Sequence, residues 1–122
     1  MERYDDALAD LNRAIDLDPQ YAWAIGSRGA THRAMSRYDD ALADFDRAIE
    51  LDPQYAWAIA ERGEIYRQME RYDDALADYN RAIDLDPRDD DYAAKRAEIN
   101  RLMSKSEGAL PEPSGLEPLS ES

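Results

Sequence analysis

An internal repeat of 34 residues constrains this chain more than any other feature. The octamer RYDDALAD begins at residues 3, 37 and 71, so the step is 34 residues both times. The segment LDPQYAWAI begins at 17 and again at 51, and all four methionines occupy one position of the repeat. Units of this length bury their apolar faces by stacking, so the repeat predicts an array in which each unit contacts its neighbours.

The composition suits a helical protein in water and excludes several classes of function. Apolar residues make up 43% of the 122 residues and charged residues 35%, with no apolar run long enough to span a membrane. A net charge of −13 disfavours nucleic acids and anionic membranes, because their phosphates would be repelled. The chain has no cysteine and no signal-peptide pattern, which favours a cytoplasmic location.

Each unit reads as two helices. The segment 38–51 has apolar residues at helical spacing, which predicts one buried stripe, while its charged residues, including Asp44, are predicted to face water. The LDP segment ends this helix, because proline disfavours helical backbone in the residue before it. A second helix is predicted over about residues 55–69. Its Gly63, and Gly29 one unit earlier, predict a close approach of the neighbouring helix, which a Cβ would block.

At these positions the units resemble the tetratricopeptide repeat family, whose 34-residue signature sets Trp, Leu, Gly, Tyr, Ala, Phe and Pro at fixed places. The matching residues are Ile25, Arg28, Gly29, His32, Ala41, Phe45 and Pro53, and then Ile59, Arg62, Gly63, Tyr66, Ala75, Tyr79 and Pro87. The resemblance covers about residues 2–103. It implies an all-α fold, a right-handed solenoid of antiparallel helix pairs.

The repeat register divides the chain into five parts. Residues 1–21 are the second helix of a truncated repeat, 22–55 and 56–89 are full repeats, 90–103 is a capping helix and 104–122 is a disordered acidic tail. The opening MERY returns verbatim at 69–72, so we expect the chain to be the C-terminal part of a longer array. In the capping helix Ala93, Ala97 and Asn100 replace residues that would pack against a following helix.

The residues offer little for catalysis. His32 is the single histidine and stands at an aromatic position of the signature, so we interpret it as structural. The repeated Asp pairs lack the spacing of a calcium loop, and no glycine-rich phosphate loop is present. We therefore predict no enzymatic activity, no metal and no cofactor.

The resemblance implies a concave groove, lined by the first helices of successive units, that holds a partner peptide or helix. The predicted peptide-binding residues are Trp23, Arg33, Trp57, Glu64, Arg67, Glu98 and Arg101. The three arginines step by 34 residues and form a ladder, which makes an acidic segment, the chain's own tail included, a candidate partner. The two tryptophans fit groove exposure and packing between units equally well. For the arginines we favour exposure in the groove, and the alternative is that they pair with carboxylates of the groove. Outside the groove, Arg28, Arg62 and Arg96 are predicted either to extend their charged ends to water or to pair with acidic residues of the adjacent helix.

We therefore predict a bacterial-type protein–protein interaction scaffold that binds a peptide or helix segment in its groove. The alternative is a self-assembling structural module that forms homo-oligomers through its incomplete terminal repeats. Family members that bind chaperone C-termini use a clamp of Lys and Asn side chains. The corresponding positions here are Gly26, Ala30, Ala60 and Glu64, so that clamp is absent.

Overall fold

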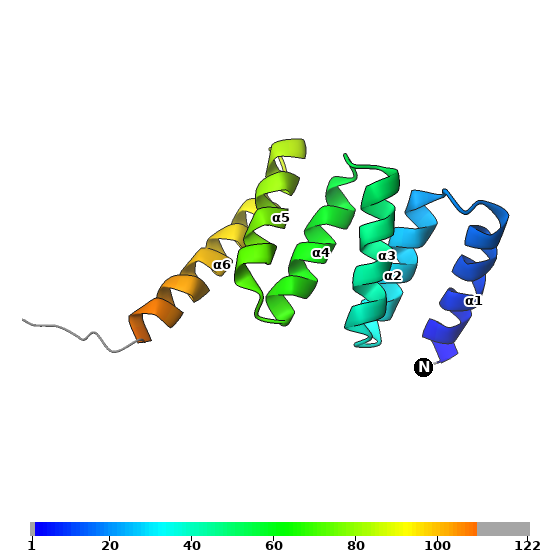
Figure 1. Cartoon of the computed structure of the whole chain (residues 1–122), viewed down its shortest axis with the longest axis horizontal. Coiled ribbons are helices and arrows are strands. Elements are labelled where there is room, and N and C mark those ends of the chain that lie inside the picture. The colour runs from blue at the N-terminus through cyan, green and yellow to red at the C-terminus, as the bar shows by residue number, and fades with distance from the viewer. Residues whose placement is uncertain (1, 110–122) are drawn as a thin grey trace, which may run out of the picture.

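The computed structural model describes residues 2–109, which form six helices and no strand. The helices are α1 (Glu2–Leu17), α2 (Ala22–Ala34), α3 (Tyr38–Leu51), α4 (Ala56–Gln68), α5 (Tyr72–Leu85) and α6 (Asp90–Ala109). Figure 1 shows them in chain order along one elongated row, with α1 at one end and α6 at the other. Each helix packs mainly against the helices before and after it in the chain. The predicted all-α solenoid of helix pairs is confirmed.

The turn between the two helices of a unit is the same in both complete units. Ser36 and Glu70 both have a φ of 62°, a left-handed conformation that is rare for residues other than glycine. In the first turn the N–H of Ser36 donates to the carbonyl of Arg33, and that of Arg37 to the carbonyl of His32, each at 2.8 Å. These bonds satisfy carbonyls that the end of α2 leaves without a helical partner.

The turn between units depends on the LDP segment, as predicted. Asp52 is extended, with φ −139° and ψ 90°, which is the conformation that the following Pro53 favours. Its carboxylate Oδ1 accepts a hydrogen bond from the backbone N–H of Gln54 at 3.1 Å. Asp18 and Gln20 form the same bond one unit earlier, so the sequence repeat produces a repeated turn.

The last helix is longer than predicted. It was expected to end at Met103, but α6 continues to Ala109 and includes the first six residues assigned to the tail. The segment 104–107 contains neither glycine nor proline, so nothing in it breaks the helix before Gly108. The rest of the predicted disordered tail, 110–122, lies outside the described residues.

Small residues let the helices of each unit approach closely. A Cβ added to Gly29 would lie 3.1 Å from Cε2 of Phe45, and one added to Gly63 would lie 3.1 Å from Cε2 of Tyr79. Phe45 and Tyr79 are almost fully buried and belong to the two core clusters of the solenoid. The predicted close approach at both glycines is therefore confirmed.

One charged residue lies in an environment that the sequence did not predict. Asp44 was expected to face water, but it is only 6% exposed and accepts two hydrogen bonds from Arg28, at 2.9 and 2.7 Å. Asp78 and Arg62 repeat this bidentate pair at the same two distances. The expectation for Asp44 was wrong because it considered α3 alone, whereas the neutralising guanidinium comes from α2.

The same contacts confirm the predicted pairing for two of the seam arginines. Arg28 and Arg62 pair with carboxylates of the adjacent helix, and the bond to Asp78 raises the pKa of Arg62 above its ordinary value. Arg96 was expected to reach water or to pair with an acidic residue, but it donates to the amide oxygen of Asn80 at 2.9 Å. Asn80 corresponds to Asn12 and Asp46, which accept from Arg28 and Arg62 in the same way. The counterpart of Asp44 and Asp78 is position 112, which lies outside the described residues.

Candidate peptide-binding groove

Two tryptophans lie at equivalent positions of α2 and α4 but in different surroundings. Trp23 is 56% exposed, whereas Trp57 is 36% exposed and packs against α2 and α3. The Trp57 ring meets the ring of Phe45 edge-on at a centroid distance of 5.8 Å, and its Cζ3 would lie 3.1 Å from a Cβ at Gly26. Trp57 thus packs between units and remains partly accessible, and Trp23 is the more accessible of the two.

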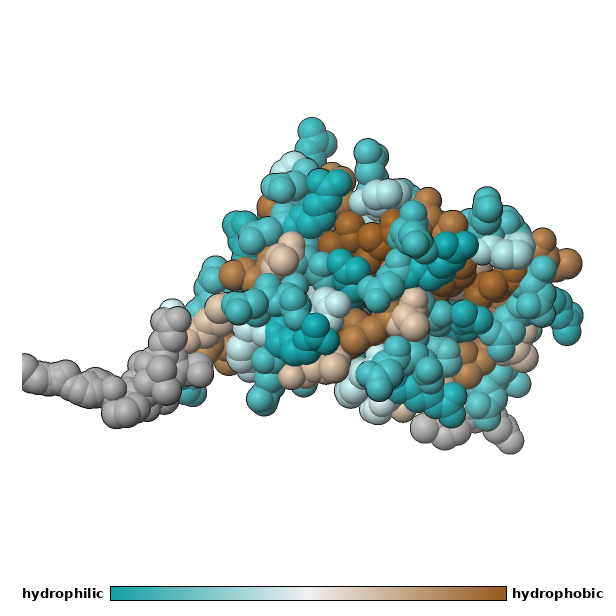
Figure 2. All heavy atoms as spheres, in the orientation of Figure 1, coloured by the Kyte–Doolittle hydropathy of each residue, from teal (hydrophilic) through white to brown (hydrophobic). Residues whose placement is uncertain are grey.

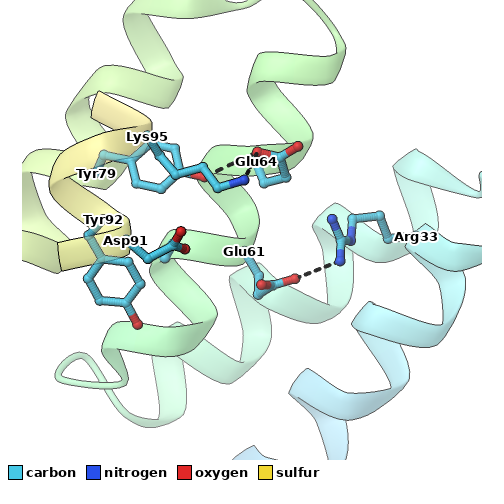
Figure 3. Close-up of a pocket in the computed structure, with 8 residues that line it drawn as sticks. Arg33, Glu61, Glu64, Tyr79, Asp91, Tyr92 and Lys95 are labelled. Atoms are coloured by element: carbon cyan, nitrogen blue, oxygen red, sulfur yellow. Dashed lines mark hydrogen bonds and ion pairs between the residues drawn. The ribbon is translucent and has the colours of Figure 1, made fainter. Parts of the chain in front are cut away.

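A small pocket of about 180 Å³ lies between α4 and α6. Its lining residues are Arg33 of α2, Ala60, Glu61 and Glu64 of α4, Tyr79 of α5, and Asp91, Tyr92 and Lys95 of α6. Figure 3 shows these side chains around the pocket, with the Asp91 carboxylate extending from α6 towards α4. The pocket therefore combines helices of three successive units.

Ion pairs neutralise two of the three arginines of the predicted ladder. The Nη2 of Arg33 lies 3.0 Å from Oε1 of Glu61, and Arg67 donates two hydrogen bonds to Glu64. Arg101 is exposed and forms no ion pair with any of residues 3–105, whose side chains the structure describes. Two of the three arginines are thus paired with carboxylates of the groove itself.

Glu64 is the most highly connected residue of the groove. Besides Arg67, it accepts a hydrogen bond from the hydroxyl of Tyr79 at 3.3 Å, and Nζ of Lys95 lies 3.9 Å away. Burial disfavours its charged form, but the bond and charge of Arg67 outweigh burial and hold the pKa of Glu64 below its ordinary value. Glu98, one unit further on, is half-buried on α6, and its charge reaches Arg67.

Glu61 lies one helical turn before Glu64, and its pKa is shifted in the opposite direction. Burial raises the pKa of Glu61, and the negative charges of Glu64 and Asp91 add to this effect. Arg33 and Lys95 offset only part of it. The Glu61–Asp91 side of the pocket is therefore where negative charge is least compensated.

Sequence reasoning identified only part of this site. Arg33 and Glu64 line the pocket as predicted groove residues, whereas five of the lining residues were missed: Glu61, Tyr79, Asp91, Tyr92 and Lys95. A signal for Asp91 was present, because it stands 34 residues after Trp57 in the position that both earlier units give to tryptophan. Trp23, Trp57, Arg67, Glu98 and Arg101 do not line this pocket.

Apart from the groove, the described residues show no metal site and no membrane-spanning helix, and the single histidine is not part of the pocket. His32 is half-buried, with its Nε2 3.6 Å from Oδ2 of Asp44. Among residues 2–109, no group of three or more His, Asp or Glu side chains is placed to hold a metal ion. In the same part of the chain, no helix combines the length and apolar character that a membrane crossing requires.

Family models agree with this architecture. A model described as tetratricopeptide repeat matches residues 22–55 and 56–89, and a second model of the same description matches 1–21. The matches cover more than half of the chain, which therefore belongs to the tetratricopeptide repeat family.

Solved structures show the same fold. The human RPAP3 first TPR domain is similar with a TM-score of 0.81 at 21% identity, covering 88% of this chain and 85% of that one. The first TPR of Spaghetti (RPAP3), bound to the HSP90 peptide SRMEEVD, has a TM-score of 0.80 at 21% identity, covering 84% and 82%. The Arabidopsis OM64 TPR domain has 0.77 at 22%, covering 82% and 83%. No curated protein matches the chain.

Proposed function

We propose that this chain is a protein-interaction module that holds a peptide or helix of a partner in the groove formed by α2, α4 and α6. The observation that carries the proposal is the exposure of Trp23 and Trp57 on α2 and α4, the two helices that also contribute Arg33, Glu61 and Glu64 to the pocket. Tryptophan and arginine are the residue types that most often anchor protein interfaces. Figure 2 shows apolar residues gathered between the helices on one face, with polar residues around them.

The ion pairs of the groove bear on the chemistry of the partner. The predicted acidic partner, including the chain's own tail, depended on a free arginine ladder, but Arg33 and Arg67 are engaged by Glu61 and Glu64. An acidic partner would have to displace these carboxylates, so the structure gives that prediction no support. Binding of chaperone C-termini is not proposed either, since Glu64 and small residues stand where the clamp would need Lys and Asn.

Two further predictions are kept as part of this proposal. We infer a binding module without catalytic activity, which the tetratricopeptide repeat family and the position of His32 against Asp44, away from the pocket, support. A bacterial cytoplasmic location stays a prediction from the sequence.

A peptide-library selection tests the proposal. We expect phage-displayed peptides that bind the chain and quench the fluorescence of its two tryptophans. Trp23→Ala should weaken the selected peptides about tenfold without unfolding the protein, because Trp23 is 56% exposed and anchors of this kind contribute more than about 1 kcal/mol. Leu17→Ala, at a residue 81% exposed outside the groove helices, is the matched control and should leave binding unchanged. A failure to select any peptide, or equal binding by both variants, would contradict groove binding.

Self-association is a second candidate, because a specific observation favours it. On α3, Ala41, Phe45 and Ala48 are completely buried against α2. The equivalent residues of α1, Ala7, Leu11 and Ala14, remain partly exposed in the described residues. At the other end of the row, Ala93 and Ala97 of α6 are exposed on the face where a following second helix would pack. In the repeat, α6 holds the position of a first helix and α1 that of a second helix, so the two exposed faces correspond to the faces that pack together within a complete unit.

The residues on these faces complement each other in charge and size. By the 34-residue register, docking α1 of one copy on α6 of another would place Asp10 against Arg96, as Asp44 lies against Arg28. It would also place Leu11, which replaces the aromatic ring, against Ala97, which replaces the glycine. Such a head-to-tail contact can repeat without closing.

Sedimentation velocity over a concentration series tests this second candidate. We expect association that Asp10→Arg and Arg96→Asp each weaken and that the double variant restores. A chain that stays monomeric at every concentration would exclude self-association and leave groove binding as the function.

A further inference from the structure

The seam between α2 and α4, the first groove seam, is filled by a tryptophan. The indole of Trp57 lies over Gly26, where an added Cβ would approach its Cζ3 to 3.1 Å, and it meets the ring of Phe45 edge-on. A flat group thus occupies the space above a small residue of α2 and beside an aromatic ring of α3.

The seam between α4 and α6, the second groove seam, lacks this tryptophan. Adding 34 residues to the three members of the first seam gives Asp91, Ala60 and Tyr79, and all three line the pocket. The pocket of about 180 Å³ therefore lies where the indole packs one unit earlier, because Asp91 has a much smaller side chain. The ring of Tyr55, which lies beside Trp57 over Gly26, is likewise replaced by Asp89. The fold itself supports a flat occupant here, since the preceding seam contains one.

The walls of the pocket suit a flat group on an apolar stem. Ala60, only 5% exposed, is its small residue, and the ring of Tyr79, held by its bond to Glu64, lies beside it. The ring of Tyr92 forms a further wall on α6 (Figure 3). Tyrosine rings attract a cation placed over their face.

The charges of the lining favour a cation. Glu61, Glu64 and Asp91 carry three negative charges among the lining residues, and Arg33 and Lys95 carry two positive ones. Arg67, outside the lining, pairs with Glu64. Arg33 pairs with Glu61 and Lys95 lies near Glu64. Asp91 forms no ion pair with any residue that the structure describes, and its carboxylate extends towards the side of the pocket that holds Glu61. Asp91 is exposed in the first turn of α6, so a cation in the pocket would pair with a carboxylate that is otherwise open to water.

We propose that this pocket, an indole site vacated by Asp91, binds the guanidinium group of an arginine side chain from the partner. The guanidinium is planar like the indole, stacks on tyrosine rings and pairs with a carboxylate through two parallel hydrogen bonds. Its methylene stem would cover Ala60. The inference rests on the proposed groove binding and adds the class of side chain that the groove selects.

Other side chains fit the pocket less well. A lysine carries the same charge, but as a compact, strongly hydrated ammonium it neither stacks nor forms the two-fold bond. A carboxylate would meet Glu61, Glu64 and Asp91 and be repelled. A neutral aromatic ring would fill the space but leave the charge of Asp91 unpaired.

Amide NMR of the full chain, titrated with Nα-acetyl-arginine amide, tests the proposal without knowledge of the partner. We expect saturable shifts confined to residues around the pocket, such as Ala60, Asp91 and Tyr92. The citrulline analogue, which keeps the shape and loses the charge, should bind at least tenfold more weakly, the loss expected for charge-assisted hydrogen bonds. No saturable shifts with the arginine probe, or equal shifts with citrulline, would overturn the proposal.

Two substitutions at Asp91 separate the effect of filling the pocket from the effect of removing its negative charge. Asp91→Trp fills the pocket as in the first seam and should abolish the shifts, while Asp91→Asn keeps the space open and should weaken binding about tenfold. Asp90→Asn removes the same charge at an exposed neighbouring position and is the matched control, expected to bind like the unmodified chain. Arginine binding that persists in Asp91→Trp would place the site elsewhere and overturn the proposal.

The peptide-library selection distinguishes failure of this inference from failure of groove binding. Peptides enriched in arginine that lose affinity for the Asp91→Trp variant would support both. Selected peptides that depend on Trp23 but carry no enriched arginine and bind the Asp91→Trp variant normally would overturn the inference and leave groove binding intact. No selected peptides at all would contradict groove binding, whatever the NMR titration shows.

Discussion

The two groove seams of this solenoid occupy the same place in the repeat but offer different surfaces. In the first seam Trp57 lies over Gly26, beside Tyr55 and against Phe45. In the second seam Asp91 occupies the tryptophan position, and a pocket opens above Ala60. The comparison teaches that a site can arise where one helix of the array departs from its copies while the repeat register is kept. Asp91, Tyr92 and Lys95 of the pocket are all such departures.

The helix pairs below the seams do not share this difference. Arg28–Asp44 and Arg62–Asp78 have the same distances, and Gly29 and Gly63 make the same close approach. The units therefore supply a constant framework, and the first helices supply the variation. This division explains how the pocket can differ while the array keeps its geometry.

The largest expected effect comes from removing the aromatic ring on which the first seam rests. Phe45 is completely buried, so Phe45→Ala should lower the free energy of unfolding by about 3–5 kcal/mol. Urea denaturation followed by circular dichroism measures this loss. Leu17→Ala, at a residue 81% exposed, should cost less than about 0.5 kcal/mol. Similar losses for the two variants would mean that Phe45 does not support the seam.

The second effect tests the constancy of the framework. Arg62→Met leaves Asp78 buried without its partner and should lower the free energy of unfolding by about 3 kcal/mol. Arg71→Met removes an ion pair to Asp74 that is half exposed on both sides and should cost at most about 1 kcal/mol. Equal losses in thermal and urea unfolding would show that the pair with Asp78 is not an essential part of the helix packing.

The third prediction exchanges the residues that distinguish the seams. Trp57→Asp should open a second pocket and lower stability by about 2 kcal/mol, less than for a fully buried tryptophan because Trp57 is 36% exposed. Asp91→Trp should close the existing pocket and raise stability by about 1 kcal/mol, as cavity-filling substitutions do. Differential scanning calorimetry of both variants measures the predicted loss of stability and the predicted gain. A destabilising Asp91→Trp would contradict the equivalence of the two seams.

The smallest effect depends on pH and separates the two glutamates of α4. The pKa of Glu64 in the folded protein is below its ordinary 4.5, so its charged form stabilises the fold above that pH, and this contribution disappears as the pH falls through the folded-state pKa. Glu64→Gln should therefore lower stability at neutral pH and have a smaller effect in acid.

Glu61 should behave in the opposite way. Its pKa is raised in the folded protein, so the fold favours the neutral form, and this preference is lost as the pH rises through the folded-state pKa. Glu61→Gln, which imitates the neutral form, should be slightly stabilising at neutral pH and without effect in acid. Urea midpoints at the two pH values check both variants, and effects of the same sign would contradict the opposite pKa shifts.

Much of the fold could be predicted from the sequence, because the repeat fixes the register. The period placed both helices of each unit, and Gly29 and Gly63 indicated the close approach that the structure contains. The end of α6 could not be placed, since the residues after Met103 carry no stop signal until Gly108. Asp44 was misplaced because a helical pattern describes one helix and does not show the guanidinium that reaches it from α2.

Less of the site could be predicted. The sequence indicated Arg33 and Glu64 as groove residues and left open whether the arginines are free or pair with groove carboxylates. The ion pairs could not be assigned because they depend on how the side chains of neighbouring helices meet. The sequence shows Asp91 at the position that the two earlier units give to tryptophan. Only the structure shows that a pocket lies beside this smaller side chain. Trp23 and Trp57 share a position, and only the helices around them make one more exposed.

A crystal structure of the Asp91→Trp variant tests the central claim most directly. We predict that the new indole lies over Ala60 with its edge against the ring of Tyr79, as Trp57 lies over Gly26 against Phe45, and that the helices keep their positions. An indole turned out into solvent, or α6 displaced from α4 to make room for it, would contradict the claim that the pocket is a vacated tryptophan site.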